Sequence, residues 1–248
     1  MNFRLEICSD SVESALIAQE AGADRIELCS SLIEGGVTPS YGTILSAREE
    51  LRIPVHVLIR PRSGDFLYSE QEYEIMRREI VFCRQSGIDG VVFGILKTDG
   101  TVDYDRTARL ADMSWPMSVT FHRAFDLCRE PEKGLHDIIS CGANRVLTSG
   151  QKNTAAEGID LIHKLVKAAS QKIIIMPGSG INDSNIKSIA EKTGASEFHL
   201  SARKEVQGMM QYRKNSISMG GNSSIQEYSR KMADPEKIAT IRKILASS

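Results

Sequence analysis

The sequence predicts a (β/α)8 barrel, in which parallel strands alternate with helices. Three observations lead to this fold class. Strand-like and helix-like segments alternate eight times along 248 residues, a length that suits one such barrel. Residues 5–9 and 26–30 repeat one pattern, LEICS and IELCS, as neighbouring parallel strands would. Glycines that can end a helix stand just before several strands, at Gly22, Gly87 and Gly142. A doubly wound open sheet is the alternative, but it would not usually run to eight regular units.

The first four strand–helix units fill the N-terminal part of the chain. Short apolar or alternating runs predict their strands at residues 5–8, 25–29, 55–60 and 90–96. Their helices are expected at residues 11–21, 41–50, 70–86 and 104–111. Asp10 precedes the first helix as a candidate N-cap.

The last four units begin with the segment 116–126, PMSVTFHRAFD, which starts as a strand and ends in polar residues. The following strands are expected at residues 145–148, 172–176 and 197–201. Their helices are expected at residues 132–140, 155–169, 184–193 and 235–245. Residues 205–233 form a polar insertion after the last strand, which predicts either a lid or a disordered loop. With that insertion, residues 1–248 are expected to form a single domain.

Composition narrows the class of protein. The 31 basic and 32 acidic residues give no net field that would attract nucleic acid or an anionic membrane. No apolar run is long enough to span a bilayer, and the N-terminus does not look like a signal peptide. Five irregularly spaced cysteines indicate reduced thiols rather than a disulfide framework. We therefore expect a cytoplasmic protein with no nucleic-acid or membrane partner.

Polar side chains recur on one face of several predicted strands. Because side chains alternate along a strand, they share a face while apolar residues occupy the other, which suits packing under helices. The polar set would then point into the barrel: Glu6, Cys8, Glu27, Cys29, His56, Arg60, Ser118, Thr120, His122, Glu197, His199 and Ser201.

Such groups are unstable in a barrel interior unless they neutralise one another or meet a ligand. Barrels of this type place their active sites at the carboxyl ends of the strands, where several of these residues lie. We therefore predict a functional site there, although a mutually satisfied ion network is the alternative. Glu27, Arg60, His122 and His199 are the candidate catalytic residues. His122 and Glu27 could act as an acid–base pair, since histidine titrates near neutrality.

Signals for anion binding surround the same end of the barrel. The sequence GSG precedes a predicted helix, where free backbone N–H groups can hold phosphate or carboxylate. Arginines follow three of the strands. The predicted anion site comprises Arg62, Ser149, Gly178, Ser179, Gly180 and Arg203.

Cys8 and Cys29 stand at equivalent positions of the repeated pattern. Adjacent strands lie about 4.8 Å apart, so the two thiolates could approach one soft metal ion such as Cu(I). Tight packing near the top of the barrel is the alternative.

Four segments, residues 25–40, 59–66, 119–126 and 145–150, resemble the CutC family of copper homeostasis proteins. They read RIELC with EGGVTPS, IRPRSGDF, VTFHRAFD and RVLTSG. The resemblance implies a cytoplasmic TIM barrel, a homodimer or higher homo-oligomer, and a role in copper homeostasis. It also implies Cu(I) as the bound ion and Cys8 and Cys29 as its ligands.

The residues inside the predicted barrel leave another function open. Glu27, Arg60, His122 and His199 would suit an enzyme that acts on a small anionic or phosphorylated metabolite. Isomerisation, aldol cleavage and hydrolysis are the reaction classes that fit such proton-transfer groups. A scaffold with an inactive site is a third reading.

Overall fold

The computed structural model describes residues 3–214, 216, 217, 219 and 226–247. Eight strands form one parallel sheet, in the order β7-β6-β5-β4-β3-β2-β1-β8. They are β1 (Arg4–Ser9), β2 (Arg25–Leu28), β3 (Val55–Leu58), β4 (Gly90–Phe93), β5 (Ser118–Phe121), β6 (Arg145–Thr148), β7 (Ile174–Pro177) and β8 (Glu197–Leu200). A parallel bridge between Gly178 and His199 joins the two edges of the sheet. The strands therefore form a nearly closed barrel, which confirms the predicted fold class and excludes the open sheet.

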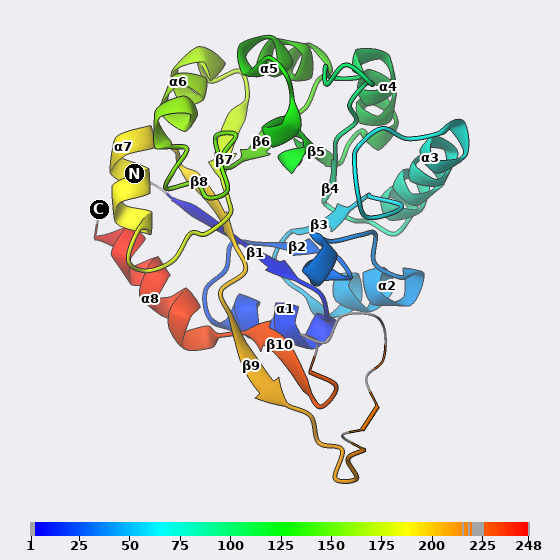
Figure 1. The fold of residues 1–248 in the computed structure, drawn as a ribbon, viewed down its shortest axis with the longest axis vertical. Helices are drawn as coiled ribbons and strands as arrows, with labels where there is room; N and C mark the ends of the chain where they lie inside the picture. The colour runs from blue at the N-terminus through cyan, green and yellow to red at the C-terminus, as the bar shows by residue number, and fades with distance from the viewer. Residues whose placement is uncertain (1–2, 215, 218, 220–225, 248) are drawn as a thin grey trace.

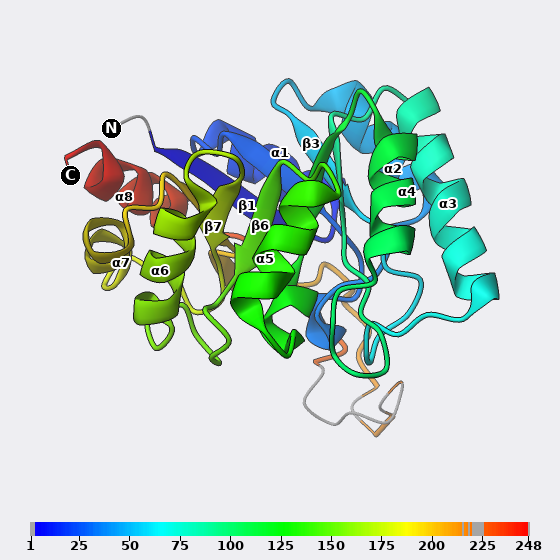
Figure 2. The ribbon, with the colours of Figure 1, turned by 90° about the horizontal axis from the view of Figure 1, so that it is seen from above.

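Helices surround the barrel, as the ring of coiled ribbons in Figure 1 shows. They are α1 (Val12–Glu20), α2 (Tyr41–Glu50), α3 (Glu70–Gln85), α4 (Tyr104–Ser114), α5 (Pro131–Ser140), α6 (Ile159–Ala169), α7 (Ile186–Thr193) and α8 (Pro235–Ala246). In Figure 2, α5 and α6 lie alongside β6 and β7. Two short 3₁₀ helices, η1 (Leu32–Glu34) and η2 (Arg123–Leu127), follow β2 and β5. No helix in the described ranges is long and apolar enough to cross a membrane.

Helix boundaries differ from the prediction where side chains supply local hydrogen bonds. Ser11, rather than Asp10, caps α1, because its hydroxyl accepts a hydrogen bond from the Ser14 N–H. The helices α6 and α7 begin four and two residues later than expected, at Ile159 and Ile186. Before α7, Asn182 and Asn185 hold the chain in turns through side-chain bonds to the backbone.

The apolar faces of the strands pack outward against the helices. Ile7, Leu28, Val57 and Phe121 are fully buried in this layer, as are the helix residues facing them. The alternating positions of the strands are thereby directed into the barrel, as the sequence pattern requires. The interior therefore carries the polar set.

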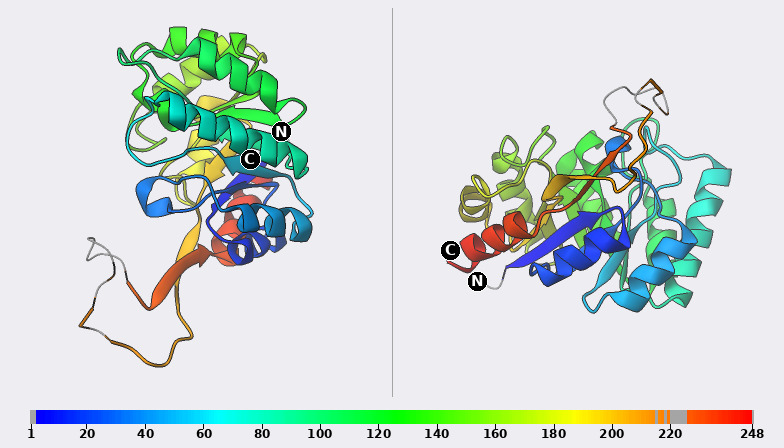
Figure 3. Two further views of the ribbon diagram at one scale, coloured as in Figure 1. Left: turned by 90° about the vertical axis from the view of Figure 1, so that its right-hand side faces the viewer. Right: turned by 90° about the horizontal axis from the view of Figure 1, so that it is seen from below.

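The polar insertion begins and ends as a two-stranded antiparallel ribbon, β9 (Arg203–Gln207) and β10 (Ser229–Ala233). The ribbon extends away from the barrel, as Figures 1 and 3 show. It is held against α1 where Ala233 N–H donates to the Ser14 hydroxyl and Arg230 pairs with Glu13. The two ends of the segment 205–233 are therefore β-strands that pair with each other.

Candidate functional site

A network of four charged residues fills the middle of the barrel. Arg25 donates to Glu6 and, at 2.7 Å, to Glu197, and Arg145 donates to Glu197 at 2.7 Å. All four side chains are buried, and the two guanidinium groups balance the two carboxylates. Burial alone would raise the pKa of both carboxyls, but Arg25 together with His199 lowers the pKa of Glu6, and Arg145 together with Arg25 lowers the pKa of Glu197.

The two arginines of this network escaped the sequence prediction, which placed only its glutamates inside the barrel. Arg25 lies two residues before Glu27, and Arg145 pairs with Thr120 on the neighbouring strand. Both positions therefore share the parity of the inward-facing set, and that periodicity was the available signal. Ser201, by contrast, is exposed beyond the end of β8 and does not lie inside.

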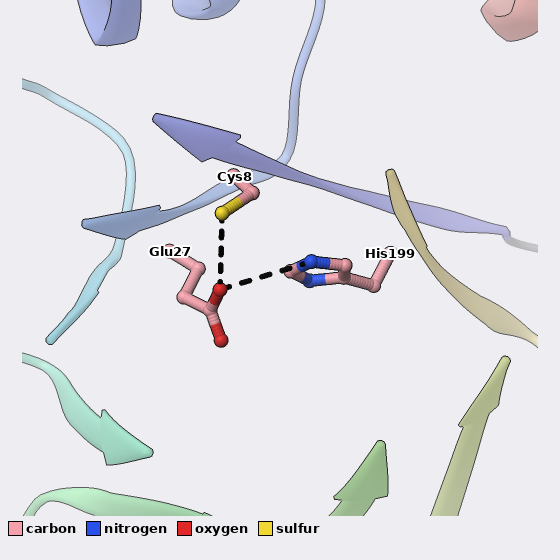
Figure 4. Close-up of side chains that lie close together, drawn as sticks. All are labelled: Cys8, Glu27 and His199. Carbon is pink, nitrogen blue, oxygen red and sulfur yellow. Dashed lines mark hydrogen bonds and ion pairs between the residues drawn. The ribbon is translucent and has the colours of Figure 1, made fainter. Parts of the chain in front are cut away.

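Three side chains converge above this network from β1, β2 and β8, as Figure 4 shows. The Cys8 thiol donates to Glu27 Oε2 at 3.2 Å, and His199 Nε2 lies 3.7 Å from the same oxygen. His199 Nδ1 is 2.7 Å from Glu6 Oε1. The strand register explains the cluster, because Cys8 is paired with Glu27 and Glu6 with His199.

Burial and charge shape the protonation of this cluster. Burial alone would lower the pKa of His199, but the carboxylates of Glu27 and Glu6 raise it well above its ordinary value. Burial also raises the pKa of Glu27. A charged His199 therefore lies between two carboxyl groups, in an interior where each charge needs a partner.

The sulfur atom of Cys29 lies 3.6 Å from that of Cys8. Both residues are buried free thiols. The contact with Cys29, burial and the nearby Glu27 carboxyl together raise the pKa of the Cys8 thiol well above its usual range. The two sulfurs that the sequence predicted as neighbours are therefore adjacent, with Cys8 protonated at neutral pH.

A cavity of about 140 Å³ opens beside these groups. All four candidate catalytic residues line it, together with Cys8 and with apolar side chains. Its walls are formed by Cys8, Glu27, Leu32, Gly35, Leu58, Arg60, Phe66, His122, Arg123, Leu147 and His199. The structure therefore brings Glu27, Arg60, His122 and His199 around one small space.

His122 follows β5 directly and caps η2. Its Nδ1 accepts a hydrogen bond from the Ala124 N–H, which places the ring proton on Nε2. Burial, with a further contribution from the positive charge of Arg60, lowers the pKa of His122 to about 3. The imidazole is therefore neutral, with Nε2–H as its donor.

The neutral His122 gives a testable pH dependence of stability. Its folded-state pKa of about 3 lies below the unfolded value of about 6.5, so only the unfolded chain takes up this proton between them. The contribution of the neutral His122 to the free energy of unfolding is present above pH 6.5 and is lost as the pH falls towards 3. We expect His122→Asn, which keeps an acceptor for Ala124, to reduce the mean pH slope of the unfolding free energy between pH 7 and 5 by about 1 kcal/mol per pH unit. Urea unfolding at pH 7, 6 and 5 measures the slope.

The matched control for this measurement is His136→Asn, since His136 is exposed on α5. It should leave the slope unchanged. An equal slope in wild type and His122→Asn would contradict the assignment of His122 as a neutral buried imidazole.

None of the six residues of the predicted anion site lines the cavity. Arg62 is held by Glu72 at 2.5 Å and by Asp65 at 3.0 Å. The Ser149 hydroxyl donates a hydrogen bond to Asp126 at 2.9 Å, and the Arg203 guanidinium lies 3.8 Å from the Asp10 carboxylate.

The glycine-rich loop also has internal partners. Gly178 N–H donates to the carbonyl of Thr148, and the Ser179 hydroxyl donates to the carbonyl of Asn153. Since α7 begins only at Ile186, Gly180 does not lie at a helix N-terminus. Phosphate binding at this loop stays a prediction.

A family model and individual relatives of this chain point to the same protein family. The model of the CutC family matches residues 3–204. A "family protein CutC" of Chromobacterium violaceum is 47% identical over 97% of this chain and 97% of its own length. The human "Copper homeostasis protein cutC homolog" is 47% identical over 98% of this chain and 89% of its own length.

Solved structures give the same grouping. A crystal structure described as the putative copper homeostasis protein CutC from Streptococcus agalactiae superposes with a TM-score of 0.77 and 32% identity. It covers 80% of this chain and 98% of its own. The phosphoribosylanthranilate isomerase of Pyrococcus furiosus superposes with a TM-score of 0.58 at 13% identity, covering 99% of this chain and all of its own. That second likeness shows the barrel fold alone.

Proposed function

Because the chain belongs to the CutC family of copper homeostasis proteins, we propose that it binds Cu(I) in the cytoplasm through the thiols of Cys8 and Cys29. The observation that carries this proposal is the pair of sulfur atoms 3.6 Å apart. Thiolates are the ligands that Cu(I) prefers among protein side chains. His199 lies beside Cys8 and would need to move only a little to add a third ligand atom.

The surrounding groups suit a soft ion held by sulfur. Cys8, Glu27 and His199 offer ligand atoms within 4.8 Å of one another. Imidazole nitrogen accompanies thiolate in copper sites, whereas the carboxylate of Glu27 is a harder ligand. Glu27 accepts the hydrogen bond of the Cys8 thiol and could receive its proton when the metal displaces it. Cys8 and Cys29 would hold the ion, and His199, which is charged in the metal-free protein, would complete its coordination after releasing a proton.

An anaerobic Cu(I) titration against a chromogenic chelator tests the proposal. We expect wild type to bind about one equivalent and the Cys8→Ser, Cys29→Ser double variant to lose that binding, since hydroxyls are poor Cu(I) ligands. Cys83→Ser with Cys141→Ser is the matched control, because these thiols are also buried but lie on the helical layer. Binding that is indifferent to Cys8 and Cys29 would refute the thiol site.

We also propose that the chain forms a single domain that assembles as a homodimer or higher homo-oligomer, as the family resemblance implies. The free state of all five cysteines fits a reducing compartment. Sedimentation equilibrium on the purified chain measures the subunit number directly, and a monomer at micromolar concentration would contradict the assembly.

A further inference from the structure

Three arginines are buried inside the barrel or at its mouth, and they differ in their partners. Arg25 and Arg145 each contact a carboxylate. Arg60 is only 6% exposed, yet within the described part of the chain no carboxylate lies within ion-pair distance of it. A buried charge without a counter-ion is strongly unfavourable. Arg60 is therefore a cation whose partner is missing from the protein itself.

The guanidinium of Arg60 is nevertheless held in a fixed place. It donates to the backbone carbonyls of Glu34 at 3.0 Å, Gly36 at 2.7 Å and Gly64 at 2.8 Å. These bonds come from the loops after β2 and β3 and use neutral acceptors. They orient the side chain beside the cavity and leave its charge uncompensated. Such positioning is what a preorganised anion site requires.

A second unused donor lines the same cavity. His122 Nε2 and Arg60 Nε are buried nitrogen atoms with no hydrogen-bond partner among the described residues. Buried donors of this kind are rare, because each one forfeits its bond to water. Phe66 packs against both side chains. Arg60 Cζ lies 5.1 Å from the centroid of the Phe66 ring, and the centroid of the His122 ring lies 4.8 Å from it.

The remaining charges at the cavity do not supply the missing partner. Glu27 lines the cavity, but it lies 3.7 Å from His199, whose charge offsets it. The other walls include the apolar side chains of Leu58 and Leu147. Since an engineered cavity of about 150 Å³ holds benzene, a space of about 140 Å³ suits a ligand of about six non-hydrogen atoms.

We propose that this cavity binds a small oxyanion, a short-chain carboxylate or a phosphate, with Arg60 as its counter-ion and His122 Nε2–H as its second donor. Carboxylates and phosphates accept charge-assisted hydrogen bonds from arginine, and the apolar wall would cover a short carbon chain. The ligand differs from Cu(I) in chemistry and in the residues that recognise it. Cys8 lines the cavity as well, so the oxyanion would lie next to the thiol pair.

Calorimetric titration of the metal-free, full-length chain tests this site. The probes are propionate, its neutral amide propionamide, and inorganic phosphate, each used alone. We expect propionate or phosphate to bind, and propionamide to bind at least about tenfold more weakly because it cannot neutralise Arg60. Which of the two anions binds more tightly tells a carboxylate site from a phosphate site. Failure of both anions to bind, or equal binding of propionate and propionamide, would overturn the proposal.

Two variants locate the binding. Arg60→Gln should weaken the preferred anion at least about tenfold. Arg62→Gln, the matched control two residues away, should change it less than twofold, because Arg62 does not line the cavity. Equal losses in both variants would place the anion elsewhere and refute the assignment.

One measurement does not depend on the folding of an Arg60 variant. In wild-type protein with ¹⁵N-labelled histidine, the Nε2–H resonance of His122 should shift on adding the anion. The same shift in the Cys8→Ser, Cys29→Ser variant would show a site independent of copper. An anion that binds without moving this resonance would contradict the role of His122, whatever the outcome of the copper titration.

Discussion

Replacing Glu197 by alanine is expected to lower the free energy of unfolding by about 3–5 kcal/mol, because it breaks a buried ion network by removing one partner. Glu197 Oε2 accepts from both Arg25 and Arg145 at 2.7 Å. Arg25 would keep Glu6, but Arg145 would retain only the hydroxyls of Ser118 and Thr120. A guanidinium would then remain buried without a carboxylate. Urea unfolding followed by circular dichroism measures the loss.

Two comparisons isolate the network. Glu74→Ala removes the partner of two surface arginines on α3 and should have no measurable effect, since exposed ion pairs contribute little. Pairing Glu197→Leu with Arg145→Met removes both charges and should recover much of the loss. A loss below about 1 kcal/mol for Glu197→Ala would show that the interior tolerates an unpaired charge.

Asp126→Ala is expected to lower the unfolding free energy by about 3 kcal/mol, because it leaves several buried donors without an acceptor. The side chain of Asp126, in η2, is only 7% exposed. Its carboxylate accepts from the Thr148 hydroxyl at 2.5 Å, from the Ser149 N–H at 3.0 Å and from the Gln151 N–H at 3.2 Å. It also accepts from Arg123 at 2.7 Å. The carboxylate therefore ties the loop after β5 to the loop after β6.

Chemical denaturation measures this loss, and hydrogen exchange at Ser149 and Gln151 should accelerate in Asp126→Ala as the loop opens. Asp126→Asn retains one oxygen acceptor and should lose less. Asp183→Ala is the surface control, because Asp183 is exposed. Unchanged exchange at Ser149 in Asp126→Ala would mean that the loop is held by other contacts.

The eight strand–helix units predicted the barrel, and period-two alternation predicted most of its polar interior, although it missed Arg25 and Arg145 and wrongly included Ser201. Glu6, Glu27 and His199 alternate with apolar residues that must pack under helices, so only one inward set was possible. The proximity of Cys8 and Cys29 followed from the repeated pattern on neighbouring strands, and the sulfur atoms lie 3.6 Å apart. These strand residues were predictable because the backbone fixes the direction of each side chain.

Loop residues were not predictable in this way, because their side chains follow local hydrogen bonds rather than a period. Arg60 was predicted at the inward-facing end of the third strand, whereas Arg62, two residues later, was predicted in the anion site. Three backbone carbonyls hold Arg60 beside the cavity, whereas Glu72 and Asp65 hold Arg62 away from it. Strand alternation therefore placed Arg60 correctly, but the position of Arg62 depends on the folded path of the loop, which no local pattern encodes.

The β9–β10 ribbon leaves and re-enters the barrel at one point. At the base of the ribbon, Asp234 N–H donates to the carbonyl of Ala202 at 2.8 Å, and Arg203 is paired with Ala233, so the end of β8 and the start of α8 are held close together. Doubling the length of a flexible loop costs only about 0.6 kcal/mol, so the barrel is largely insensitive to how much chain lies between these residues. The ribbon is therefore a suitable place for insertions in protein engineering. A dye or affinity tag inserted beyond Gln207 would lie on the ribbon, which extends away from the barrel and contributes no residue to the cavity wall.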